Sequence, residues 1–175
     1  MNKLVFTLFT GFITLYCQLI LGNLGWYLPL GLLGALYIAL AFGKSWGIVA
    51  ALLTGMTLAL LYGNAWNMLN IITFPLLAGF SSWWIEHHDE DINLKFYFPG
   101  VLAGVLAAFP ALVQELFYWG EWGHFSQSIL FTLLRMLWCA VVSGVLFEAI
   151  LFAGEAATLY LGLPRFLTRK GNRQR

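Results

Sequence analysis

The most polar run in the chain, residues 85–91, reads Ile-Glu-His-His-Asp-Glu-Asp and combines residue types that could bind a metal ion. It contains four of the eight acidic residues and two of the three histidines. Zinc ligands usually converge from separated positions, so adjacent histidines rarely point at one ion. No second cluster of histidine and cysteine supplies further ligands. We therefore predict no metal site and no cofactor.

The same run is interpreted in one of three ways: as a solvated connector, as a cytoplasmic docking loop for a partner, or as an acidic segment attracted to the basic C-terminal tail. The predicted docking loop consists of His87, His88, Asp89, Glu90 and Asp91.

Three further charged residues lie inside long apolar runs, where a charge needs a reason. Glu115 and Arg135 lie toward the same end of two neighbouring helices, so we expect an intramembrane ion pair. The alternative is that Arg135 extends alone toward the membrane surface. Glu148 either relays protons in a transporter or is a buried acid satisfied by packing or by protonation.

An enzyme is not predicted. A serine hydrolase would need a serine and a histidine at similar depth, and no histidine lies inside an apolar run. A metalloprotease would need a His-Glu-x-x-His helix, which the sequence lacks.

Composition indicates the surroundings of these residues. Hydrophobic residues make up 61% of the 175 residues, and charged residues make up 10%. A soluble domain normally carries about 25% charged residues. The chain therefore has too few charges to cover a surface that faces water. We predict an all-α polytopic membrane protein, a bundle of six transmembrane helices.

The spans follow from apolar runs of the length that crosses a bilayer. They are predicted at about 4–21, 28–42, 46–62, 68–85, 96–119 and 128–152. They form a single domain of residues 1–163, followed by a basic cytoplasmic tail of residues 164–175. The last apolar run continues to Leu163, beyond the length of one span. We expect it to leave the membrane core near Gly154 and Glu155 and to continue into or along the interface.

Basic residues predict the orientation. With six spans, eight of the nine Lys and Arg residues fall on one side, and the ninth, Arg135, lies within a span. The positive-inside rule then places both termini in the cytoplasm. We expect a multi-pass protein of a cytoplasmic membrane.

Small residues recur every four positions in the third predicted span. Such spacing forms a groove in which another helix can approach closely. The predicted groove residues are Gly43, Gly47, Ala51, Gly55, Ala59 and Gly63, together with Gly100, Gly104 and Ala108 in the fifth span. The groove packs either the protein's own helices or a partner helix.

The segments 30–43 and 47–63 resemble the rod shape-determining protein family MreD. Pro29 before the second span, Gly55 and the ending Leu-Leu-Tyr-Gly at 60–63 match the family's pattern. Ala59 stands where the family often has an aspartate. The resemblance covers roughly residues 15–85, and its motifs are hydrophobic patterns.

The resemblance implies a non-enzymatic protein of the bacterial inner membrane that takes part in cell elongation, rod shape and peptidoglycan synthesis. The implied partners are an MreC-like bitopic membrane protein and, indirectly, the elongation glycosyltransferase and a penicillin-binding transpeptidase. Membrane lipids are expected contacts and nucleic acid is not. The family's fold is thought to be related to that of the S components of energy-coupling-factor transporters.

The alternative is that the chain is itself such a substrate-binding S component for a vitamin, or another small transporter. S components usually carry an alanine-x-x-x-alanine motif in the first span. Residues 1–22 lack this motif, although the spacing occurs at Ala35/Ala39 and at Ala103/Ala107.

Overall fold

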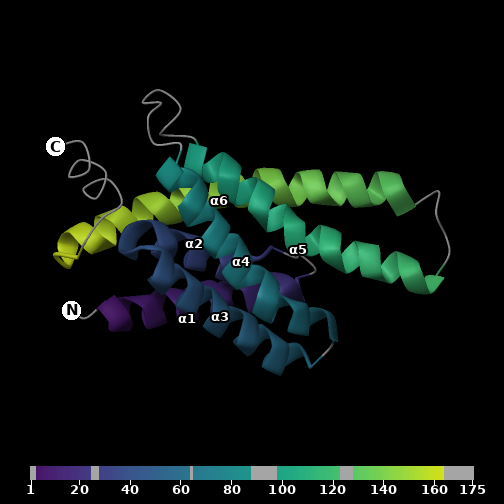
Figure 1. Cartoon of the computed structure of the whole chain (residues 1–175), viewed down its shortest axis with the longest axis horizontal. Coiled ribbons are helices and arrows are strands. Elements are labelled where there is room, and N and C mark those ends of the chain that lie inside the picture. Colours follow the sequence, from purple (N-terminus) through teal and green to yellow (C-terminus); the bar gives the residue numbers. More distant parts are fainter. Residues whose placement is uncertain (1–2, 25–27, 64, 88–97, 123–127, 164–175) are drawn as a thin grey trace.

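The computed structural model describes residues 3–24, 28–63, 65–87, 98–122 and 128–163. These residues form an all-α bundle (Figure 1). Its helices are α1 Lys3–Asn23, α2 Leu30–Phe42, α3 Lys44–Tyr62, α4 Ala65–His87, α5 Phe98–Trp122 and α6 Ser128–Tyr160. The prediction of an all-α chain with six helices is confirmed.

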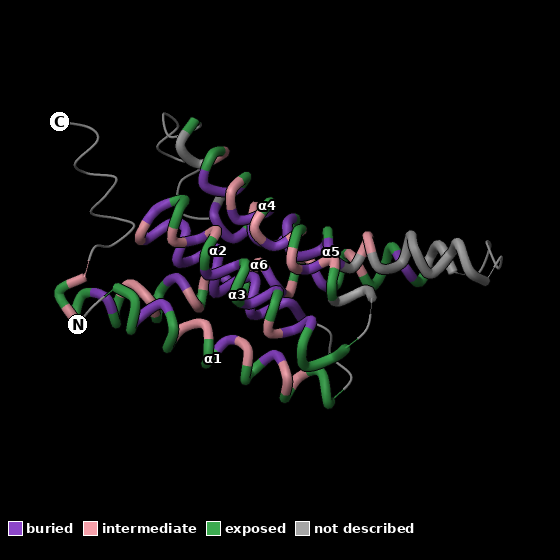
Figure 2. The backbone as a smooth tube through the Cα atoms, turned by 60° about the horizontal axis from the view of Figure 1, so that its bottom comes forward, coloured by how far each residue is buried: buried purple, intermediate pink, exposed green. Residues whose placement is uncertain are grey.

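Helix α2 is the centre of the bundle. Every residue from Leu30 to Ala41 is buried. A helix that is apolar on all sides is stable only when other elements surround it. The helices around it are α1, α3, α4, α5 and α6, all of which contact it. Helix α1 behaves differently, because only one of its faces is buried (Figure 2).

Two pairs of helices have the most extensive contacts, α3 with α4 and α5 with α6. Helices α2 and α3 are joined by one residue, Gly43, with φ 105°. That backbone conformation strains any residue with a side chain, so glycine makes this short connection feasible. The Gly43 amide donates to the Ala39 carbonyl at 3.0 Å and so closes the last turn of α2.

The structure contains helices suited to a membrane. Three segments are long and apolar enough to cross one: Lys3–Asn23, Lys44–Tyr62 and Phe131–Tyr160. Large apolar side chains also cover the outside of the bundle, with Leu60 83% exposed and Phe131 78% exposed. A soluble monomer rarely exposes so much contiguous apolar surface. These features indicate a multi-pass membrane protein.

Helix α6 is longer than the predicted span of residues 128–152. It has 33 residues, about 50 Å at 1.5 Å per residue, against a bilayer core of about 30 Å. The helix does not end at Gly154. Instead, the missing side chain at Gly154 makes room for the buried ring of Tyr37 in α2. Helix α6 runs through Gly154 and Glu155 without a break, and the exit from the membrane core near these residues stays a prediction.

This contact predicts the effect of Gly154→Ala. A Cβ atom at this position would lie 2.6 Å from the hydroxyl oxygen of Tyr37, which is 0% exposed and has no room to move away. Overpacking of this kind costs about 1–3 kcal/mol. We expect the variant to unfold at a lower denaturant concentration in detergent. The matched control is Gly11→Ala, because a Cβ at Gly11 meets nothing within 4 Å. If both variants have the same stability, the Tyr37 contact does not constrain α6.

Candidate functional site

Helices α5 and α6 approach one another through small residues. A Cβ atom at Gly104 would collide with the carbonyl oxygen of Ala140 and would lie 3.3 Å from the Cα of Gly144. A Cβ atom at Gly144 would lie 3.0 Å from the carbonyl oxygen of Gly100. The two backbones are therefore in direct contact, which only glycine and alanine permit.

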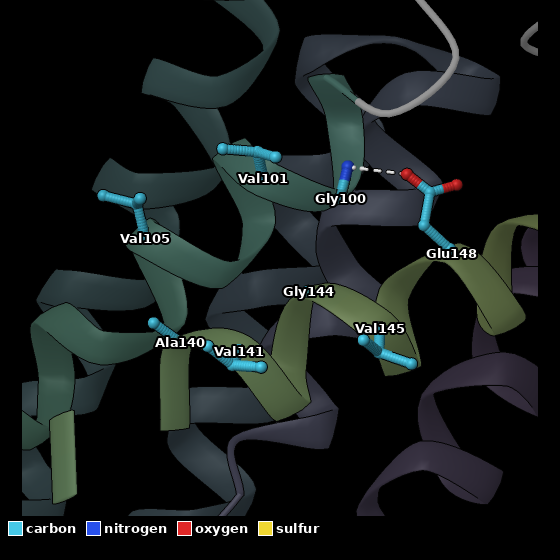
Figure 3. A pocket seen from close by; sticks show the side chains of 8 residues that line it. All are labelled: Gly100, Val101, Val105, Ala140, Val141, Gly144, Val145 and Glu148. Carbon is cyan, nitrogen blue, oxygen red and sulfur yellow. Dashed lines mark hydrogen bonds between the residues drawn. The ribbon is translucent and has the colours of Figure 1, made fainter. Parts of the chain in front are cut away.

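A hydrogen bond between the two helices lies at one end of this contact. The amide of Gly100, in the first turn of α5, donates to Oε1 of Glu148 at 2.9 Å (Figure 3). First-turn amides have no acceptor within their own helix, and an acidic group is favoured at the positive end of the helix dipole. Glu148 of α6 therefore caps α5. Gly100 is needed there because a Cβ would collide with the carboxyl group.

The same arrangement occurs where α2 begins. The amide of Gly31, the second residue of α2, donates to Oε1 of Gln18 in α1 at 2.8 Å. A Cβ at Gly31 would lie 3.2 Å from that oxygen and 2.5 Å from Cγ2 of Thr54. Both α2 and α5 are thus capped by a side chain of a neighbouring helix. A glycine lets that side chain reach the backbone in each case.

A groove runs along the outside of the α5–α6 contact, with a cavity volume of about 340 Å³. Its lining is almost entirely apolar and ends at Glu148 (Figure 3). We call this surface the α5–α6 groove. Its lining residues are Gly100, Val101, Val105, Ala140, Val141, Gly144, Val145 and Glu148.

The small residues of α3 lie against other helices of the same chain. A Cβ at Gly47 would collide with Ala39 of α2, and a Cβ at Gly55 would lie 3.1 Å from Cα of Ile71 in α4. Ala51 and Ala59 are buried. Gly63 has a left-handed backbone, φ 60°, and ends α3. These small residues of α3, which we call the α3 stripe, are thus covered by α2 and α4, whereas the α5–α6 groove is open.

The other predicted site residues are only partly described. Arg135 is exposed on α6, and Ala108 is buried on α5. The side chain of Glu115 lies outside the described residues, and so does the predicted ion pair between Glu115 and Arg135. His87 ends α4, with Nδ1 2.9 Å from the carbonyl oxygen of Trp83. The rest of the predicted docking loop, residues 88–91, also lies outside the described residues.

The sequence predicted Glu148 as a possible buried acid. The structure has it half-buried, with the Gly100 amide as a partner that the sequence did not identify. The Gly100–Glu148 bond joins residues 48 positions apart in the chain, and the Gly31–Gln18 bond joins residues 13 apart. The available signal was a nearby proline, because proline is favoured where a helix begins: Pro29 lies two residues before Gly31, and Pro99 lies directly before Gly100.

In the part of the chain that the structure describes, no group of three or more His, Cys, Asp or Glu residues is arranged to hold a metal ion. Comparison with known proteins gives no relative: no protein-family model, curated protein or solved structure matches the chain.

The cap on α5 predicts a difference between two substitutions of Glu148. Glu148→Ala leaves the Gly100 amide without its acceptor and should lower the free energy of unfolding by about 0.5–2 kcal/mol, as loss of an N-cap does. Glu148→Gln keeps an oxygen acceptor and loses only the charge at the helix end, worth about 0.3–1 kcal/mol. Unfolding by SDS in mixed micelles measures both. Equal losses in the two variants would contradict the role of Glu148 as a cap.

Proposed function

We propose that the chain crosses the bacterial inner membrane six times with both termini in the cytoplasm. The three long apolar helices support this layout, as does the placement of eight of nine basic residues on one side. The arrangement of the bundle is also consistent with it. The first residues of α1 and the last residues of α6 lie at the same end of the molecule (Figure 1).

Within that membrane, we propose that the protein is a non-enzymatic scaffold that binds the helices of partner proteins, as a component of the cell-elongation machinery. The resemblance of residues 30–63 to the MreD family supports the choice of machinery. The α5–α6 groove carries the scaffold part of the proposal. It is an apolar concave surface whose valines remain exposed, whereas the α3 stripe is covered by α2 and α4.

Reporter fusions test the proposed layout. Because Lys and Arg are retained on the cytoplasmic side, green fluorescent protein fused to either terminus should fluoresce. Alkaline phosphatase, which folds only outside the cytoplasm, should be inactive at both termini. The control is a phosphatase fusion after residue 64, between α3 and α4, which should be active. Active phosphatase at either terminus would contradict six crossings.

Complementation tests the proposed function. Expressed in a rod-shaped bacterium depleted of its own MreD protein, the chain should restore rod shape when supplied together with the MreC-like protein from its own genome. That protein should also co-purify with the chain in mild detergent. Membrane insertion of the expressed chain is the control, checked by fractionation. Recovery of an ABC-type ATPase with a bound vitamin would instead support the S-component alternative and overturn the scaffold.

A further inference from the structure

The walls of the α5–α6 groove are two ridges of valine side chains that could flank one helix. Val101 and Val105 form a ridge on α5, and Val141 and Val145 form a ridge on α6. The residues of each ridge are four positions apart, the spacing of the ridges that pack into the grooves of another helix. All four valines are more than half exposed, at 63%, 61%, 57% and 68% in chain order.

The floor of the groove is made of small residues. Gly100, Ala140 and Gly144 complete the lining, and the backbones of α5 and α6 meet where a Cβ at Gly144 would lie 3.0 Å from the carbonyl oxygen of Gly100. Without a hydrophobic driving force between helices in lipid, close backbone approach and van der Waals packing hold transmembrane helices together. A groove with low residues along its floor and apolar ridges on both sides lets a third helix come close to both α5 and α6.

The groove also has an electrical polarity. Among the described residues that line it, Glu148 is the one ionisable group, and it lies at the end where α5 begins. In the proposed layout this is the cytoplasmic end. Proteins that cross the inner membrane carry their excess of Lys and Arg on the cytoplasmic side. A partner helix therefore brings a cation to the end of the groove at which this chain has an acid.

From this complementarity we propose that the α5–α6 groove seats the single transmembrane helix of a bitopic partner, and that a Lys or Arg at the cytoplasmic end of that helix pairs with Glu148. The inference rests on the proposed scaffold function and names the surface through which it acts. A lipid acyl chain would fit the valine walls, and an ethanolamine headgroup would bring an ammonium group to Glu148. Neither needs the small residues that let a helix backbone come close, so the protein helix is the better match.

The test uses the full-length chain with the MreC-like protein of its own genome as the probe. Three variants are compared for the amount of probe that co-purifies from the membrane. Val145→Trp fills the groove at an exposed position. Leu60→Trp, on the 83% exposed Leu60 of α3, is the matched control outside the groove. Glu148→Gln removes the charge and keeps an acceptor for the Gly100 amide.

Val145→Trp should reduce recovery of the probe at least tenfold, and Leu60→Trp should leave it unchanged. Glu148→Gln should reduce recovery several-fold. With a probe whose flanking Lys and Arg residues are changed to Gln, Glu148→Gln should cause no further reduction. This double-mutant cycle isolates the direct pairing between Glu148 and the probe's cation. A thermal melt checks that each variant is folded at the temperature of the co-purification, and Val101→Trp replaces Val145→Trp if the latter is not.

The outcomes separate the two proposals. Full recovery with Val145→Trp would overturn the groove as the binding surface while leaving the scaffold function intact. Loss of co-purified phospholipid without loss of the probe would identify the groove as a lipid site and would also overturn it. If Glu148→Gln reduces recovery of the Lys- and Arg-to-Gln probe as strongly as recovery of the unaltered probe, the charge pairing is overturned. No recovery by the wild-type chain would overturn the scaffold function and the groove together.

Discussion

An amide N–H that is shielded from water must find an acceptor within the protein, because burying it without one costs free energy. The first-turn amides of a helix have no acceptor within their own helix. In this bundle two of them are satisfied by neighbouring helices, Gly31 by Gln18 and Gly100 by Glu148. Each bond requires a glycine and a close approach of two helices. The same two contacts therefore fix where α2 lies against α1 and where α5 lies against α6.

Glycine elsewhere in the chain follows from the same demand for close approach. Gly47 brings α3 against α2, Gly55 brings α3 against α4, and Gly154 receives the Tyr37 ring from α2. These positions explain how a helix of only 13 residues, α2, is enclosed on all sides. This packing determines which apolar surface remains open to a partner. Small residues that serve the interior are covered, and the α5–α6 groove is a concave apolar surface that stays open, with its acid at one end.

The sequence predicted the six helices and their order, because long apolar runs separated by polar residues mark transmembrane helices. It also singled out Gly47, Gly55, Gly100 and Gly104 as packing positions. It did not predict which helices these residues contact. A small residue at every fourth position forms the same groove whether that groove faces the bundle or the lipid. It also did not show that the Tyr37 ring packs at Gly154, because a contact between residues far apart in the chain leaves no local pattern.

The most direct test of this account is hydrogen exchange at the amide of Gly100, measured in lipid nanodiscs. An amide bonded to Glu148 across the helix boundary should exchange as slowly as amides in the middle of α5, and Glu148→Ala should remove that protection. Rapid exchange at Gly100 in the unaltered chain, at the rate of a free helix end, would contradict the claim that the neighbouring helix caps α5 and positions the groove.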